Sequence, residues 1–216
     1  MRASLLRMLY EIEHRLPFNI APSNVPDRDL RKFLEGDPRP LPGRALDLGC
    51  GNGRNALYLA RHGWQVSGVE LVGHAVKEAR RKMAAAGADV RVVHGDASRL
   101  SDYDMGDGFD LVVDSCCYHA VAVERRDAYA AQVTKAAAPG ALMFMVAFVE
   151  QNTPGMNVTE DDLRSRFTGW EILETAPVSG QEMAEYYDGP AFAKRTLTNG
   201  RYRARRYRMR RLADIS

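Results

Sequence analysis

The stretch Ala45-Leu46-Asp47-Leu48-Gly49-Cys50-Gly51-Asn52-Gly53 decides the fold of this 216-residue chain. A short, mostly apolar run is typical of a buried strand, and three alternating glycines follow it. Glycine allows the backbone to turn sharply and to approach a ligand that any side chain would push away. The pattern therefore predicts a strand that ends in a ligand-binding turn and leads into a helix. Such a turn alone could equally be purely structural.

Strand-like and helix-like segments alternate on the C-terminal side of this turn. Strands are expected at residues 44–48, 65–70, 90–94, 109–114 and 141–149, and helices at 55–62, 74–86 and 124–137. This order is typical of an α/β fold with a doubly wound, mostly parallel sheet and helices on both faces. Pro139-Gly140 is expected to close the last of these helices.

The C-terminal part departs from this alternation. Thr159-Glu160-Asp161-Asp162 predicts the start of a short helix that reaches residue 167, and strands are expected at 170–175 and 202–212. Asn199-Gly200 predicts a hairpin turn before the last strand. Because the apolar alternation slips at Arg205-Arg206, a bulge or a strand end is expected there.

Residues 1–42 are expected to form an N-terminal helical cap or lid, and residues 43–216 the single α/β domain. An amphipathic helix is predicted at 2–16 and a short helix at 27–34, and a Pro- and Gly-rich loop follows at 36–43. The beginning of the chain shows no apolar run of the length of a signal peptide or a membrane span. A cytoplasmic monomer or homodimer without a membrane partner is therefore expected.

Composition argues against several classes of function. The net charge of +2 points to no polyanionic partner, although arginines are concentrated at 201–211. Three cysteines, Cys50, Cys116 and Cys117, form neither a disulfide framework nor the ligand spacing of a zinc site. We therefore expect no metal, although the adjacent pair could in principle bind a soft one.

Acidic residues close the next two predicted strands. Glu70 ends one strand about twenty residues after the turn, and Asp96 follows the next. The carboxyl ends of parallel strands share one edge of the sheet, where ligands bind. The spacing G-x-G-x-G differs from the G-x-G-x-x-G of a dinucleotide site. Asp47 is poorly placed beside a diphosphate but well placed beside a ligand with an amino group and a sulfonium, which favours S-adenosylmethionine.

These segments together resemble the motifs of class I S-adenosylmethionine-dependent methyltransferases. The resemblance spans residues 43–149. Its motifs are the opening stretch, Gly68-Val69-Glu70, Gly95-Asp96-Ala97, Phe109-Asp110-Leu111-Val112-Val113-Asp114 and Ala138-Pro139-Gly140-Ala141-Leu142. It implies a Rossmann-like sheet of seven strands, mostly parallel with an antiparallel C-terminal strand, and S-adenosylhomocysteine as the product.

The resemblance also implies roles for individual residues. Gly49 and Gly51, with Cys50 between them, would line the methionine moiety, and Asp114 would lie near its end. Glu70 would hold the ribose, Leu71 would lie against the adenine, and Asp96 and Ala97 would meet the adenine edge. Taken alone, Asp96 could instead cap a turn and Asp114 a helix. Their shared register with Glu70 favours the cofactor site.

Ser115-Cys116-Cys117-Tyr118-His119 follows the fourth strand and resembles the small-molecule branch of the family, of the thiopurine and quinone or phenol types. His119 is expected to act as a base or to orient the acceptor; alternatively, it is hydrogen-bonded at a helix start. Phe18, Met183, Tyr186 and Tyr187 would suit a flat, apolar acceptor. An O, N or S atom of such a molecule is the expected methyl acceptor.

Two other functions remain open at this point. An RNA or protein methyltransferase could use the arginines at 201–211 to contact its substrate, although the same arginines could simply face solvent and pair with carboxylates. No amino-nucleobase signature accompanies them, so a nucleic-acid partner is not favoured. A cofactor-binding enzyme that cyclises or isomerises its substrate without methylating it could share the same fold.

Overall fold

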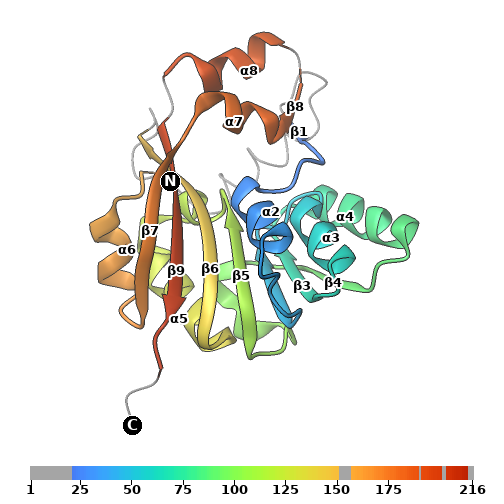
Figure 1. Ribbon diagram of the computed structural model, residues 1–216, viewed down its shortest axis with the longest axis vertical. Coiled ribbons are helices and arrows are strands. Elements are labelled where there is room, and N and C mark those ends of the chain that lie inside the picture. The colour runs from blue at the N-terminus through green and yellow to red at the C-terminus, as the bar shows by residue number, and fades with distance from the viewer. Residues whose placement is uncertain (1–20, 151–156, 190, 201–202, 214–216) are drawn as a thin grey trace.

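The computed structural model describes residues 21–150, 157–189, 191–200 and 203–213. Its main feature is a seven-stranded sheet (Figure 1). The strands are, in order across it, β4 (Val90–His94), β3 (Gln65–Glu70), β2 (Arg44–Leu48), β5 (Phe109–Ser115), β6 (Ala137–Glu150), β9 (Arg203–Arg211) and β7 (Trp170–Val178). Only β9 runs antiparallel to its neighbours. The predicted Rossmann-like sheet with an antiparallel C-terminal strand is therefore confirmed.

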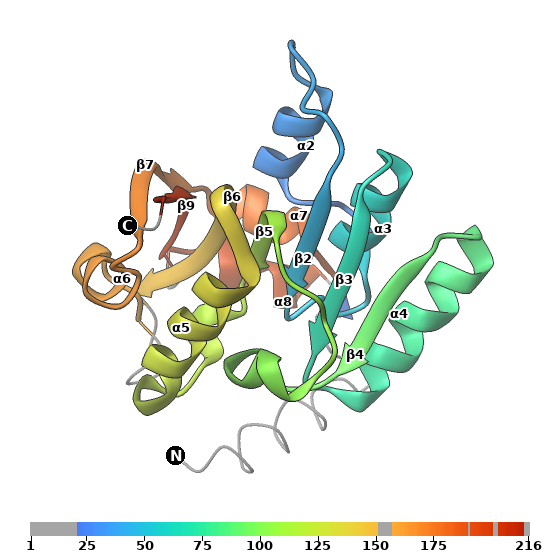
Figure 2. The same cartoon turned by 90° about the horizontal axis from the view of Figure 1, so that it is seen from below.

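Helices cover both faces of this sheet (Figure 2). On one face, α2 (Arg28–Glu35), α3 (Arg54–Arg61) and α4 (Gly73–Ala86) bury their apolar side chains against β2, β3 and β5. On the other face, α5 (Arg126–Ala136) and α6 (Glu160–Arg166) pack against the sheet. Burial on both faces explains the nearly continuous apolar sequence of β5 and β6.

A small layer lies beyond the carboxyl ends of the parallel strands, at the top of Figure 1. It consists of β1 (Ala21–Pro22), α7 (Gly180–Glu185), β8 (Tyr187–Asp188) and α8 (Ala191–Thr198), which we call the cap. β1 and β8 pair with each other as a separate two-stranded sheet. Buried side chains join the cap to the sheet, and we call them the cap-side cluster: Val146, Phe148, Val178, Met183, Tyr186, Leu197 and Ala204.

Two predicted turns are wrong. β6 begins at Ala137, directly after α5, so Pro139-Gly140 lies inside the strand; the pairing of β5 with β6 shifts register there, between Phe109 and Leu111. This bulge accommodates Gly140, whose φ is +84°. Asn199-Gly200 is not a hairpin turn but connects α8 to β9, because the cap is inserted between β7 and β9.

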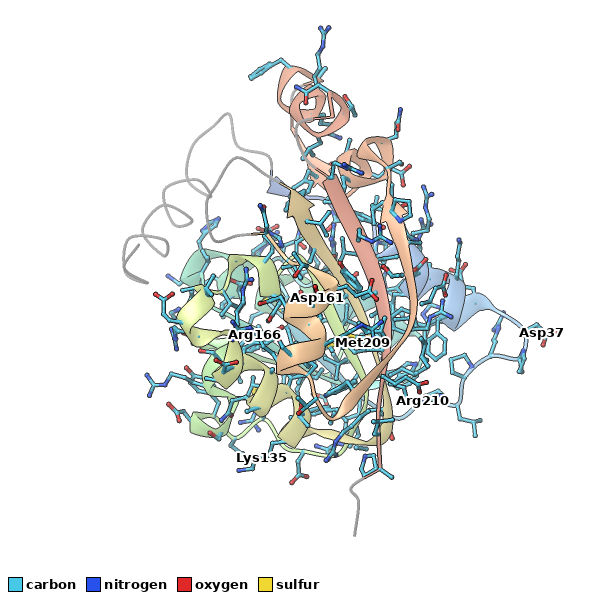
Figure 3. The ribbon with its side chains drawn as sticks, turned by 90° about the vertical axis from the view of Figure 1, so that its left-hand side faces the viewer. Asp37, Lys135, Asp161, Arg166, Met209 and Arg210 are labelled. Carbon is cyan, nitrogen blue, oxygen red and sulfur yellow. The ribbon has the colours of Figure 1, made fainter. Side chains whose placement is uncertain are left out.

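The bulge or strand end expected at Arg205-Arg206 is also wrong. Both arginines pair without interruption with β6 and β7. The apolar alternation slips because β9 is buried on both faces. Ala204 belongs to the cap-side cluster, whereas Tyr207 and Met209 pack with α5 and α6 on the opposite face. Figure 3 looks onto α6 and labels Met209 beside its neighbour Arg210.

The N-terminal part is described only from residue 21. The predicted helix at 2–16 and Phe18 lie outside the described residues. The short predicted helix is present as α2, which Asp27 caps by accepting hydrogen bonds from the backbone N–H groups of Asp29 and Leu30. In the part of the chain that the structure describes, no helix is long and apolar enough to span a membrane.

Candidate active site

The glycine-rich turn after β2 packs tightly against the segment that follows β5. Gly49 has φ +61°, and a Cβ atom placed on it would lie 2.8 Å from both Cβ and Sγ of Cys117. Gly51 also has a positive φ, +54°. A side chain at Gly49 is therefore excluded both by the backbone conformation and by the close approach of Cys117, and one at Gly51 is disfavoured by the backbone conformation. Cys50, between the two glycines, is buried, and its Sγ points toward Gly68 of β3.

Glu70 at the end of β3 joins two loops at the carboxyl edge. Its Oε2 accepts a hydrogen bond from the backbone N–H of Gly51 at 2.9 Å, and its Oε1 accepts one from Val72 at 2.7 Å. The side chain is buried. Since each carboxylate oxygen has two lone pairs, both oxygens can accept a further hydrogen bond from a ligand.

Asp47 of β2 is fully buried beneath the same turn. Its Oδ2 has no hydrogen-bond partner among the described residues. Burial raises the pKa of Asp47 to about 7, although Arg54 and the backbone N–H of Ala56 oppose this rise. A buried carboxylate oxygen without a donor is costly unless a ligand supplies one.

The structure places Asp96 at the start of the 3₁₀ segment Ala97–Asp102, which it caps. Its Oδ1 accepts from the backbone N–H and the hydroxyl of Ser98, and its Oδ2 pairs with Arg125 at 2.6 Å. Burial opposes ionisation of Asp96, but these hydrogen bonds and Arg125 outweigh it and lower the pKa. Ala97 is nearly buried, whereas Leu71 is 37% exposed and open to a ligand.

Asp114 at the end of β5 is completely buried and organises the next turn. It accepts hydrogen bonds from the backbone N–H groups of Cys117 and Tyr118 and from the hydroxyl of Tyr129, the last at 2.6 Å. Burial raises the pKa of Asp114 to about 6, and these hydrogen bonds limit the rise. Asp114 therefore fixes the segment that carries Cys117 and His119.

His119 lies in the 3₁₀ turn Tyr118–Ala120, with 4% of its surface exposed. Its ring packs in a T-shaped arrangement with the ring of Phe148 in the cap-side cluster, with the ring centroids 4.8 Å apart. Its Nδ1 has no hydrogen-bond partner in the described part of the chain. Burial and the nearby Arg126 lower the pKa of His119 to about 3, so the imidazole is neutral.

Arg54, which belongs to none of the sequence motifs with a predicted role, connects the helix after the glycine-rich turn to the cap. Its guanidinium donates to Ser115 Oγ and to the backbone carbonyl of Tyr186, both at 2.8 Å, and lies over the Tyr186 ring. A cation at the first residue of a helix is electrostatically unfavourable, so an arginine there was a signal that other contacts hold it.

The arginines of β9 make local contacts with acidic and polar groups. Arg208 pairs with Glu174 and Arg210 with Glu171, while Arg205 donates to Thr175. Arg206 is the most buried, with pairs to Asp29 of α2 at 2.5 Å and to Glu182 of α7 at 2.6 Å. This agrees with the expectation that these arginines pair with nearby carboxylates.

The three thiols are close to the candidate site but protonated. Burial raises the pKa of Cys116 to about 12 and places those of Cys50 and Cys117 well above the usual range. Metal ligation requires the thiolate form. Within the described ranges, no group of three His, Cys, Asp or Glu side chains is arranged to hold a metal ion.

Comparisons with known proteins agree with this geometry. A family model described as a methyltransferase domain matches residues 45–140. The 2-heptyl-1-hydroxyquinolin-4(1H)-one methyltransferase of Mycobacteroides abscessus is 31% identical over 174 residues, 77% of this chain and 74% of that protein. Sequence identity of 31% over about three quarters of both chains shows that the two proteins belong to one family.

Solved structures support the fold. One, from work on the conversion of a disulfide bond into a thioacetal group during echinomycin biosynthesis, matches with a TM-score of 0.74 and 24% identity, over 98% of this chain and 93% of that chain. The [4+2]-cyclase SpnF matches with a TM-score of 0.67 and 19% identity, over 97% and 93%. Together with the glycine-rich turn, Glu70 and the seven-stranded sheet, the sequence relationship shows that this chain belongs to the class I S-adenosylmethionine-dependent methyltransferase family.

Proposed function

We propose that this enzyme methylates an O, N or S atom of a small, planar and largely apolar molecule that binds between the cap and the carboxyl ends of β5 and β6. The observation that carries the proposal is the contact of His119 with Phe148. It places a buried imidazole with an unpartnered nitrogen against an apolar side chain, two residues after Cys117, which packs against the turn that follows β2. A few polar groups in an apolar pocket are typical of small-molecule sites. The relative that acts on a hydroxyquinolone supports the same class of acceptor.

The residues at the carboxyl edge fit S-adenosylmethionine, which supplies a methyl group activated by its sulfonium. The unpartnered Asp47 Oδ2 would accept a hydrogen bond from the amino group, and Gly49, Cys50 and Gly51 would line the methionine moiety. The remaining assignments are Glu70 for the ribose, Leu71, Asp96 and Ala97 for the adenine, and Asp114 for the methionine end, through the turn that it holds.

The protein's own contribution is positioning. Methyl transfer requires the acceptor lone pair to lie in line with the bond that breaks, in a pocket without competing water. Asp114 and Arg54 both fix the segment between β5 and His119: Asp114 accepts a hydrogen bond from the backbone N–H of Cys117, and Arg54 donates to Ser115 Oγ. Met183 and Tyr186 of the cap region are buried in the cap-side cluster and exclude water on the acceptor side.

The proposal is tested by thermal shift with S-adenosylhomocysteine, followed by an acceptor screen read by mass spectrometry. We expect stabilisation by the cofactor product and methylation of bicyclic aromatic acceptors such as a 1-hydroxyquinolin-4-one. A short RNA and an unfolded peptide serve as competing acceptors. Methylation of the RNA or peptide in preference to every small acceptor would contradict the proposal. Conversion of a small molecule without consumption of S-adenosylmethionine would contradict it as well.

Binding of S-adenosylhomocysteine is expected to strengthen as the pH rises toward neutrality. The pKa of Asp47 is raised to about 7, so below this pH the ligand's ammonium group must displace a proton from the carboxyl group. The affinity should therefore fall by up to about tenfold for each pH unit below the pKa. Titration calorimetry at about pH 6, in buffers of different ionisation enthalpy, should detect release of close to one proton.

The matched control for this effect is Asp47→Asn. It keeps the size of the side chain and removes its ionisation, so binding should become weaker and independent of pH. If the wild-type affinity is constant across this range, Asp47 is not the partner of the amino group.

A further inference from the structure

Arg126 holds the backbone of His119, and Nδ1 of the buried imidazole has no hydrogen-bond partner among the described residues. Arg126 of α5 donates to the backbone carbonyls of His119 and Val121, and to that of Asn157. These bonds fix the 3₁₀ turn that carries the ring. The ring packs against that of Phe148 in a T-shaped arrangement, and Nδ1 has no hydrogen-bond partner among the described residues. A buried polar atom without a partner is uncommon and points to a ligand group that satisfies it.

Resting on the proposed function, we propose that His119 binds the acceptor as a hydrogen-bond donor through Nδ1–H, and that the acceptor reacts as an anion. The substrates would then be small aromatic molecules with an acidic O–H or S–H group, rather than amines or weakly acidic alcohols. A neutral imidazole carries one N–H donor, and a hydrogen bond to an anionic oxygen is stronger and shorter than one to a neutral oxygen.

A histidine that acts as a general base takes up a proton and becomes a positively charged imidazolium. The surroundings of His119 disfavour this charged form. Burial and Arg126 lower the pKa of His119 to about 3. Proton transfer to it from a phenol of ordinary acidity would therefore be unfavourable by a factor on the order of 10⁷. Asp162 of α6 pairs with Arg126, but it is shared with Arg166 and the Tyr118 hydroxyl, and the aromatic neighbour of the ring from β6 is the uncharged Phe148.

Other groups near the turn do not offer a better base. Burial raises the pKa of Cys116 and Cys117, so both thiols hold their protons. Asp114 already accepts three protein hydrogen bonds. An acceptor that has lost its proton to water before binding needs no base at all.

The reaction then balances without any proton transfer on the enzyme. A lone pair of the anionic oxygen or sulfur forms the bond to the methyl carbon while the carbon–sulfonium bond breaks. The electron pair of that bond stays on the departing sulfur, which becomes the thioether of S-adenosylhomocysteine. The negative charge of the acceptor and the positive charge of the sulfonium are neutralised together, which a dry, apolar pocket favours.

The test uses the full-length enzyme and the acceptors 4-nitrophenol, 4-cyanophenol, phenol and 1-hydroxyquinolin-4-one. We expect that kcat/KM rises with pH up to the pKa of each acceptor, so that the inflection moves with the acceptor. His119→Asn keeps an N–H near the position of Nδ1 but cannot take up a proton, and should retain kcat/KM within about tenfold of the wild type. His119→Gln and His119→Ala should lose about 10- to 100-fold more.

A binding measurement gives a second readout. The absorbance of 4-nitrophenol bound to the complex of the enzyme with S-adenosylhomocysteine reports its ionisation directly. We expect bound nitrophenolate with the wild type and with His119→Asn, and a smaller ionised fraction with His119→Gln.

Two outcomes would overturn the donor role. They are an equal loss in His119→Asn and His119→Ala, and an inflection at one fixed pH for all acceptors. Because the acceptor series is measured on the wild type, it decides the question even if a variant fails to fold. If the wild type binds S-adenosylhomocysteine and methylates amines but no acidic acceptor, the inference fails while the proposed function stands. If it methylates no small molecule, the proposed function itself fails.

Discussion

Arg206→Met is expected to lower the free energy of unfolding by about 3–5 kcal/mol. The Arg206 guanidinium pairs with Glu182 through both carboxylate oxygens, at 2.6 and 2.7 Å, and with Asp29 at 2.5 Å. Only 4% of the Glu182 side chain is exposed. Removal of the arginine would leave a buried carboxylate without its main partner, which costs far more than the lost attraction between two exposed charges. Urea unfolding measures the effect.

The matched control is Arg210→Met on the same strand. Arg210 and Glu171 are each about half exposed and pair at 3.0 Å, so this change should cost less than about 1 kcal/mol. The double variant Arg206→Met/Glu182→Met should recover part of the loss, because it removes both charges together. A loss in Arg206→Met no larger than that in Arg210→Met would show that the buried pair does not stabilise the attachment of α7.

The arginines of β9 illustrate which parts of the fold the sequence could predict. The strands that carry a single apolar pattern, such as β2 and β3, begin and end as predicted, because local periodicity determines them. β9 carries apolar residues for both faces and a buried ion pair, so its pattern predicts a bulge that the strand does not have. Which arginine is buried depends on α2 and α7, which are distant in sequence.

The same distinction holds for the candidate site. Asp47 lies in β2, Glu70 ends β3 and His119 follows β5. Local sequence is enough to predict these positions, and the structure places the three strands side by side. The contact of Arg54 with Tyr186 could not be predicted in this way, because 132 residues separate them. The hydrogen bonds of Asp96 and Asp114 also show that both residues hold turns, as the simpler interpretation of each allowed.

Glu70→Ala is expected to weaken S-adenosylhomocysteine binding by about 100-fold or more. The Glu70 carboxylate already accepts one backbone hydrogen bond at each oxygen, from Gly51 and Val72. These bonds fix its orientation, so its remaining lone pairs could accept hydrogen bonds from a ligand without further loss of side-chain entropy. Two charge-assisted hydrogen bonds to the ribose hydroxyls would each contribute about 1.5–3 kcal/mol. Titration calorimetry with the purified variant measures the loss.

An analogue of S-adenosylhomocysteine that lacks both ribose hydroxyls separates a direct role of Glu70 from a structural one. If Glu70 binds the ribose, Glu70→Ala should cost the parent ligand about 100-fold but the analogue only a few-fold, because the analogue has no hydroxyl to lose. Glu70→Gln keeps one acceptor oxygen but turns an amide N–H toward a backbone donor, so its loss should be intermediate. If both ligands lose the same affinity in Glu70→Ala, the carboxylate only holds the loops of Gly51 and Val72 together, and the ribose assignment is wrong.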